Sequence, residues 1–287
     1  MATHRRQFLK AIAASGMASP CLARAAADQA VVEASPKATR NPVREAAGAR
    51  GEVLLTSAET PLGRALADGI GAAYRLRPTA RTAVPGRSAL LVSDLGADNS
   101  TRSLVRGVEG ILHLPGAYSQ SDAAGPLDHC TRSTYNLLQA AAQEGVKHVI
   151  YLGSLAVMTG HPEDLTVDED WRPLAKGDSP GLAEYLGEVV CREFAREGKI
   201  DVVVLRLGKV VQTEKAAGRP FDSLWVEQSD VVQAISLALA AQLDKNGPRL
   251  GAWSVFHILS GSRQARYSIE KAKRLLGYRP HFTGVER

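Results

Sequence analysis

Residues 53–64 of the chain read VLLTSAETPLGR, an apolar run that passes through a short turn into a helix-like segment. The apolar run has no polar alternation, which is typical of a strand buried on both faces of a sheet. Thr60 is a favourable N-cap residue and Pro61 suits the first position of a helix, so we expect a helix to begin there. The segment therefore predicts the strand–turn–helix unit with which many α/β folds open.

Apolar runs and helix-like stretches alternate along the rest of the chain. Strands are expected at residues 52–56, 88–92, 110–114, 148–152, 201–207 and 254–259. Helices are expected at residues 61–73, 101–108, 127–144, 181–197 and 229–243. This alternation predicts a parallel sheet with helices on both faces, in which ligands bind beyond the carboxyl ends of the strands.

Further motifs follow residues 53–64 in a characteristic order. They are Asp94-Leu95, residues 110–116 (GILHLPG), Asn136-Leu137-Leu138, residues 146–151 (VKHVIY), Ser154-Leu155-Ala156-Val157, residues 203–208 (VVLRLG), residues 229–234 (SDVVQA) and residues 275–280 (LLGYRP). In this order the chain resembles the NAD-dependent epimerase/dehydratase family, the extended short-chain dehydrogenases, over about residues 52–280.

The resemblance implies a Rossmann-type doubly wound parallel sheet in one NAD(P)-binding domain, residues 51–287, with a small C-terminal substrate cap. Only 16 residues separate Gly208 from Trp225, a stretch that many sugar-nucleotide enzymes of the family extend into a larger lobe. The cap is therefore expected to be small, as in the compact uronate-dehydrogenase-like members of the family.

The nucleotide-binding turn of the family normally carries three glycines, which allow a tight turn, close approach of a pyrophosphate and helix–strand packing. Ser57, Thr60 and Gly63 occupy those positions here, so only the packing glycine remains. Thr60 places a branched side chain where a phosphate would approach, and Glu59 adds a negative charge. We therefore expect weak binding of NAD or NADP at the helix start, and an altered or empty loop is the open alternative.

The resemblance also assigns the adenosine end of the cofactor. Asp94 and Leu95 correspond to the pair that faces the adenine. Arg75 and Arg77 follow the region where the second strand is expected, in place of an acid. Arginines there favour NADP through its 2′-phosphate, although they can equally be surface charges.

Catalysis in the family needs a Tyr-x-x-x-Lys pair on one helix with a Ser or Thr beside it, because the Tyr transfers a proton and the Lys lowers its pKa. Ser154 stands at the Ser/Thr position. An alignment without gaps puts Pro180 at the Tyr position and Glu184 at the Lys position. A shifted register offers Tyr185 without a following Lys, so Ser154 and Tyr185 are the candidate catalytic residues.

Two classes of function remain. The first is a divergent NAD(P)-dependent oxidoreductase or epimerase that acts on a small, sugar-like substrate. The second is a non-catalytic binding protein that uses the same crevice for a small-molecule ligand. No metal site is expected, because Cys21, Cys130 and Cys191 are far apart and form no metal-ligand spacing.

The N-terminus resembles a twin-arginine export signal, with Arg5-Arg6-Gln7-Phe8-Leu9-Lys10, an apolar run over residues 11–20 and Ala23-Arg24-Ala25 as a cleavage pattern. Residues 1–25 are thus expected to be a signal peptide and residues 26–50 a flexible linker. The resemblance implies contact with the twin-arginine (Tat) export machinery and a periplasmic or other extracytoplasmic location.

The charge distribution argues against a nucleic-acid partner. The formal net charge is +5, but residues 1–25 contribute +4 and the remainder only +1. The remainder has no basic stripe with interleaved aromatic residues, which nucleic-acid binding would require. No apolar stretch reaches the length of roughly 18 residues that a transmembrane helix needs.

Overall fold

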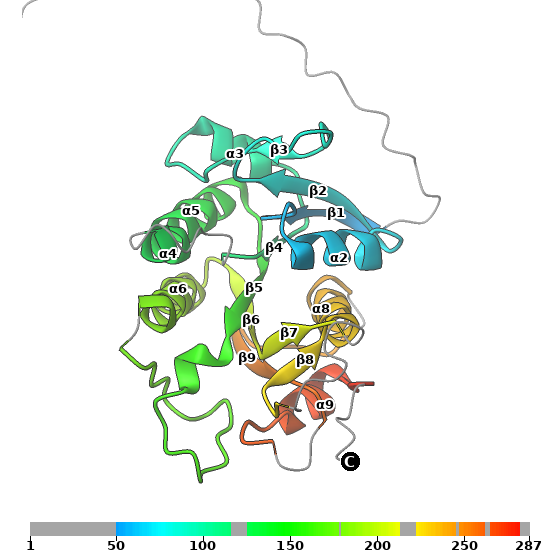
Figure 1. Ribbon diagram of the computed structural model, residues 1–287. Coiled ribbons are helices and arrows are strands. Elements are labelled where there is room, and N and C mark those ends of the chain that lie inside the picture. Colours follow the sequence, from blue (N-terminus) through cyan, green and yellow to red (C-terminus); the bar gives the residue numbers. More distant parts are fainter. Residues whose placement is uncertain are drawn as a thin grey trace, which may run out of the picture. The chain divides into compact units, whose positions relative to one another are not determined.

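The computed structural model describes residues 50–115, 125–177, 179–212, 222–244, 247–261 and 265–281. The expected signal peptide, and the expected linker up to residue 49, lie outside these ranges. The described strands of the main sheet are β1 Arg50–Leu55, β2 Tyr74–Ala80, β3 Leu91–Val92, β4 Gly110–His113, β5 His148–Ser154, β6 Asp201–Leu207 and β9 Trp253–Ile258. Their order is β3-β2-β1-β4-β5-β6-β9, and all neighbours are parallel (Figure 1). The doubly wound parallel sheet is confirmed.

Helices cover both faces of this sheet (Figure 1). One face packs against α2 Pro61–Ile70, α8 Gln228–Leu243 and α9 Glu270–Leu276. The other packs against α3 Asn99–Val105, α5 Thr134–Glu144 and α6 Ser179–Arg196. Before α5, the short helix α4 Gly125–Asp128 continues into a π-helical turn, η1 His129–Ser133.

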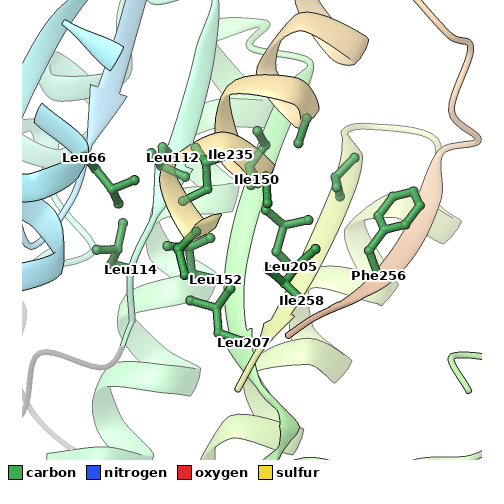
Figure 2. Packing of buried hydrophobic residues seen from close by; sticks show 14 of the residues in the cluster. Leu66, Leu112, Leu114, Ile150, Leu152, Leu205, Leu207, Ile235, Phe256 and Ile258 are labelled. Atoms are coloured by element: carbon green, nitrogen blue, oxygen red, sulfur yellow. The ribbon is translucent and has the colours of Figure 1, made fainter. Parts of the chain in front are cut away.

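The core follows from the continuously apolar strands. Successive side chains point to opposite faces, so Leu112 and Ile150 pack towards α2 and α8, while Ile111 and Val149 pack towards α3, α5 and α6. Figure 2 shows the first of these two clusters, in which the strand leucines and isoleucines meet Leu66 of α2 and Ile235 of α8. Burial on both faces explains why these strands lack polar alternation.

Strand β2 is the strand of the main sheet that the sequence did not reveal. A strand was expected at residues 88–92, but only Leu91–Val92 is a strand there, and it forms the edge strand β3. The sequence of β2, YRLRPTA, contains two arginines and a proline and therefore lacks the apolar pattern of a buried strand. Arg77 is accommodated because its guanidinium pairs with Glu52 at 2.5 Å and also donates to two backbone carbonyls of the α3 region.

Beyond β6 lies a second, two-stranded parallel sheet of β7 Lys209–Val211 and β8 Trp225–Glu227. This pair and α9 occupy the place of the small C-terminal cap. A 3-10 turn, η2 Leu155–Met158, follows β5. Within the described ranges, no helix is long and apolar enough to cross a membrane.

Candidate functional site

The turn after β1 keeps the backbone shape that glycine normally provides. Ser57 has φ +52°, in the left-handed region that side chains rarely adopt. Its hydroxyl donates to the Leu114 carbonyl at 2.8 Å, which ties the turn to the end of β4. Gly63 stays essential, because a Cβ there would lie 2.3 Å from the Ser57 carbonyl oxygen. The chain therefore preserves the turn although two of its three usual glycines are absent.

Thr60 caps α2 with a hydroxyl that is directed into the loop. Its Oγ1 donates to the Ser57 carbonyl at 2.8 Å and accepts from the Gly63 N–H at 2.9 Å. The hydroxyl is thus engaged within the turn. The hydroxyl thereby occupies the Gly63 N–H, one of the N–H groups with which the start of a helix can bind an anion.

Glu59 lies beside the carboxyl end of β2. Its Oε1 accepts a hydrogen bond from the Arg81 N–H at 3.3 Å, and its Oε2 is buried without a hydrogen-bond partner in the part of the chain that the structure describes. The backbone supports this placement, because the Ala58 N–H donates to the Thr79 carbonyl at 2.8 Å. The Glu59 carboxylate therefore stands next to the last residues of β2.

A pocket opens at the carboxyl ends of β1, β2 and β4, beside the start of α2. Its lining residues are Thr56, Ser57, Thr79, Arg81, Ser93, Asp94, Leu95, His113, Leu114, Pro115, His129 and Ser133. The structure thus brings Ser57, Asp94 and Leu95 to one pocket, while their role in cofactor binding stays a prediction. Asn136 of α5 fixes the Asp94-Leu95 turn by donating to the Leu95 carbonyl at 2.9 Å.

The placement expected for Arg75 and Arg77 is wrong. Both residues lie in the first half of β2, away from its carboxyl end, and Arg77 is bound to Glu52. The residue that follows β2 is Arg81, which the sequence analysis did not single out. Its Nη1 lies 2.7 Å from Nδ1 of His129. Only a correct placement of β2 could have identified it.

His113 is a structural residue at the floor of the pocket. Its Nδ1 lies 2.9 Å from Thr56 Oγ1 and its Nε2 lies 3.0 Å from Thr134 Oγ1, so the ring links β1, β4 and α5. Burial, with a smaller effect of His129, lowers the pKa of His113 to about 3. The imidazole is therefore neutral and does not act as a proton donor to a ligand at physiological pH.

The two candidate catalytic residues lie in different surroundings. Ser154 ends β5, and its Oγ accepts from the Ala156 N–H at 3.1 Å. Tyr185 lines a separate cavity of about 290 Å³, together with Trp171 and Trp253, between α6, the start of β9 and residues 169–173. Ser154 does not line that cavity, so the structure does not bring the two residues into one pocket.

Glu184, at the family's Lys position, lies among buried polar groups on the inner side of α6. Its Oε2 and the hydroxyl of Tyr151 are both buried and lack a hydrogen-bond partner within the described ranges. Burial, together with the nearby charge of Glu188, raises the pKa of Glu184 to about 8. Burial also raises the pKa of Tyr151, with Glu184 as the next cause. Gly187 makes room for this arrangement, because a Cβ there would lie 2.1 Å from the Tyr151 hydroxyl oxygen.

The cysteines near Glu184 are not candidates for reactive groups, and no metal site accompanies them among the described residues. Cys130 and Cys191 are buried free thiols, and burial raises the pKa of both. Among the described residues, no group of three or more His, Cys, Asp or Glu side chains could hold a metal ion. The site can therefore offer hydroxyl and carboxyl groups for proton transfer.

Comparison with known proteins identifies a matching family and several relatives. The model of the NAD dependent epimerase/dehydratase family matches residues 60–223. The chain is 23% identical over 261 residues to the NAD-dependent glucose-6-phosphate dehydrogenase of Haloferax volcanii, covering 82% of this chain and 94% of that protein. It is 26% identical over 192 residues to a uronate dehydrogenase of Pseudomonas syringae pv. tomato, covering 65% of this chain and 69% of that protein.

Solved structures agree on the fold. Glucuronic acid dehydrogenase from Chromohalobacter salexigens superposes with a TM-score of 0.68 at 20% identity, covering 82% of this chain and 86% of that chain. A variant of uronate dehydrogenase from Agrobacterium tumefaciens in complex with NAD gives a TM-score of 0.67 at 19% identity, covering 80% and 84%. The fold is thus shared with NAD-dependent dehydrogenases of sugar acids.

Proposed function

The chain belongs to the NAD-dependent epimerase/dehydratase family, and we propose that it is an oxidoreductase that uses a nicotinamide dinucleotide to act on a small, sugar-like substrate. One observation carries the proposal. Ser57, Arg81, Asp94 and Leu95 meet in a pocket at the carboxyl ends of the strands, beside the start of α2. In doubly wound sheets this is where the adenosine half of a dinucleotide binds.

The residues present fit a dinucleotide. Ser57 holds the tight turn and Gly63 permits the close packing of α2 on β1. The orphaned Glu59 Oε2 is an acceptor beside the end of β2, where the adenosine ribose is held in this fold. The sugar-like substrate is proposed from the relatives, whose names specify glucose 6-phosphate and uronate.

When bound, the dinucleotide would supply hydride chemistry, and this chain must move the accompanying proton. Ser154 ends β5, and we propose that its hydroxyl hydrogen-bonds the reacting oxygen of the substrate. Glu184 takes the position that the family gives to the Lys, on a helix whose inner side packs against β5. We assign proton transfer to these two side chains, because Pro180 offers no hydroxyl at the Tyr position.

The test is a turnover assay of the purified chain with NAD and with NADP on a panel of aldoses and uronates, followed by the absorbance of the reduced nicotinamide. We expect turnover with at least one sugar. Ser154→Ala should lower kcat/KM by about 10²–10⁴-fold and leave dinucleotide binding unchanged. Ser103→Ala is the matched control, because that hydroxyl lies on the exposed side of α3 and donates to the Asn99 carbonyl.

A second candidate function follows from helix α6, on which Pro180 and Glu184 lie. Pro180 and Glu184 replace the proton-transferring pair, which favours a protein that binds a dinucleotide or another small ligand without turning it over. Binding without turnover, over the whole panel and between about pH 6 and about pH 9, would favour this candidate, because both protonation states of Glu184 are then sampled.

We also propose that the protein works outside the cytoplasm after twin-arginine export. The sequence of residues 5–10 supports this, with the apolar run and the small-residue cleavage pattern that follow. These residues lie outside the described ranges. Export of a folded protein would allow a cofactor to be bound before transport.

A further inference from the structure

One carboxylate oxygen of Glu59 is buried and has no hydrogen-bond donor in the part of the chain that the structure describes. Oε1 accepts from the Arg81 N–H at 3.3 Å, whereas Oε2 has no hydrogen-bond partner among the described residues. Buried polar atoms in proteins almost always have a partner, because an unsatisfied one costs free energy. Glu59 does not itself line the pocket, but it binds the backbone N–H of Arg81, which does, so its orphaned oxygen points to a donor on a ligand held there.

The position of this oxygen identifies the donor. The Ala58 N–H binds the Thr79 carbonyl, so the residues after Ser57 run beside the end of β2, and Glu59 reaches Arg81 directly after that strand. In Rossmann-type folds a carboxylate at the end of the second strand accepts a hydrogen bond from the ribose 2′-hydroxyl of NAD. Strand β2 ends at Ala80, and neither the strand nor the two residues that follow it, Arg81 and Thr82, provide an acid.

We infer that Glu59 supplies this ribose-binding carboxylate from the turn after β1, and that the protein therefore prefers NAD to NADP. The inference rests on the proposed function, since it assumes that the crevice holds a dinucleotide. It replaces the expectation that Arg75 and Arg77 favour NADP, because these arginines lie in the first half of β2.

The negative charge of Glu59 explains the preference for NAD over NADP. The 2′-hydroxyl of NAD can donate to Oε2, whereas the 2′-phosphate of NADP would bring a second negative charge against the Glu59 carboxylate. Arg81 is the cation that could offset this repulsion. However, its guanidinium Nη1 lies 2.7 Å from His129 Nδ1, so the side chain reaches towards η1. Arg64 and Arg87 bind backbone carbonyls, those of Glu59 and Ala58, at 2.9 and 3.5 Å.

The experiment compares the dissociation constants of NAD and NADP for the full chain by calorimetry. We expect NAD to bind at least about tenfold more tightly than NADP. Glu59→Gln should weaken NAD by about 3–10-fold and strengthen NADP, so that the preference largely disappears. Asp68→Asn is the matched control: it removes the same charge from an exposed site on α2 and should leave the preference unchanged.

A second measurement uses only the unaltered chain and therefore does not depend on the folding of a variant. NAD that lacks the adenosine 2′-hydroxyl should bind about tenfold more weakly than NAD, because Oε2 is then left without a donor.

The outcomes separate the inference from the proposed function. NADP that binds as tightly as NAD, or a 2′-deoxy analogue that binds as tightly as NAD, overturns the role of Glu59 and leaves the oxidoreductase proposal standing. A folded Glu59→Gln variant with an unchanged preference does the same. Absence of binding by either dinucleotide overturns both.

Discussion

Two acids lie on the inner side of α6 and differ in how they are compensated. Glu188 forms a bidentate pair with Arg206, with Nε–Oε1 and Nη2–Oε2 distances of 2.9 and 2.8 Å, and both side chains are only 3% exposed. Glu184, one helical turn earlier, makes no such pair with any described residue, and its pKa is raised to about 8 by burial and by Glu188. Glu184 is therefore mainly neutral at pH 7, whereas Glu188 is held by a cation.

This difference predicts a pH-dependent stability. The pKa of Glu184 is raised on folding, so its contribution is complete below about pH 4.5 and is lost as the pH rises to about 8. Each unit in that window lowers the free energy of unfolding by about 1.4 kcal/mol. Glu184→Gln should make urea-unfolding free energies flatter between these pH values than those of the unaltered chain.

Glu188 and Glu169 also have raised pKa values and remain in both proteins, so the difference between the two curves isolates Glu184. Parallel curves for Glu184→Gln and the unaltered chain would show that Glu184 is charged and solvated in the folded protein.

Gly187 gives a second prediction at the scale of the residue. A methyl group there would meet the Tyr151 hydroxyl oxygen at 2.1 Å and the Cys130 carbonyl oxygen at 2.8 Å. Gly187→Ala should lower the free energy of unfolding by about 1–3 kcal/mol, as overpacking usually does. Gly177→Ala is the control, since nothing lies within 4 Å of a Cβ there. Equal stability of the two variants would mean that Tyr151 is free to move away.

The sequence could identify some of the residues at the pocket but not all of them. Ser57, Asp94 and Leu95 each follow an apolar strand that the sequence shows clearly, and the structure brings them to one pocket, while their role in binding stays a prediction. Arg81 was missed because β2 was not recognised. Glu59 was recognised only as a repulsive charge, since its contact with the end of β2 depends on how the turn folds in three dimensions.

Elements of structure were predictable where burial imposes a simple pattern. Strands β1, β4, β5 and β6 are buried on both faces, and their continuous apolar runs predicted them within about one or two residues. Strand β2 lies towards the sheet edge and accommodates Arg77 through an ion pair and backbone carbonyls, so its sequence has no such run. The π-helical turn η1 also has no signature in the sequence.

The start of α2 leads to a prediction at the scale of the element. Thr60→Gly removes the hydroxyl that occupies the Gly63 N–H and thereby frees a donor for a phosphate. The variant should bind NAD several-fold more tightly, while losing only a few tenths of a kcal/mol of stability, because glycine is itself an acceptable N-cap. Calorimetry and urea unfolding measure the two effects. Weaker binding would mean that the Thr60 side chain assists the ligand.

The molecule as a whole retains the family fold while its chemical residues change. Superposition on glucuronic acid dehydrogenase gives a TM-score of 0.68 at only 20% identity. Such a fold depends on the hydrophobic pattern of strands and helices, which many sequences satisfy, whereas catalysis depends on a few exact side chains. The sequence could therefore predict the architecture and show that Pro180 and Glu184 are departures, but not what replaces the missing pair.

Export is a prediction for the whole chain. Changing Arg5 and Arg6 to Lys should leave the precursor in the cytoplasm, because the twin-arginine route requires the arginine pair. Changing Arg40 and Arg44 to Lys is the matched control and should not affect export. Fractionation of cells followed by detection of the protein measures both. Mature protein outside the cytoplasm in the Arg5/Arg6 variant would contradict twin-arginine export.

Dinucleotide binding is the property on which the proposed activity depends, and titration calorimetry of the full chain with NAD measures it most directly. We predict saturable binding of one NAD per chain, which Glu59→Gln weakens and Asp68→Asn does not. A folded protein that gives no saturable heat with NAD would contradict the assignment of the pocket at the carboxyl ends of β1, β2 and β4 as the NAD site. NAD binding that Glu59→Gln leaves unchanged would contradict only the role of Glu59.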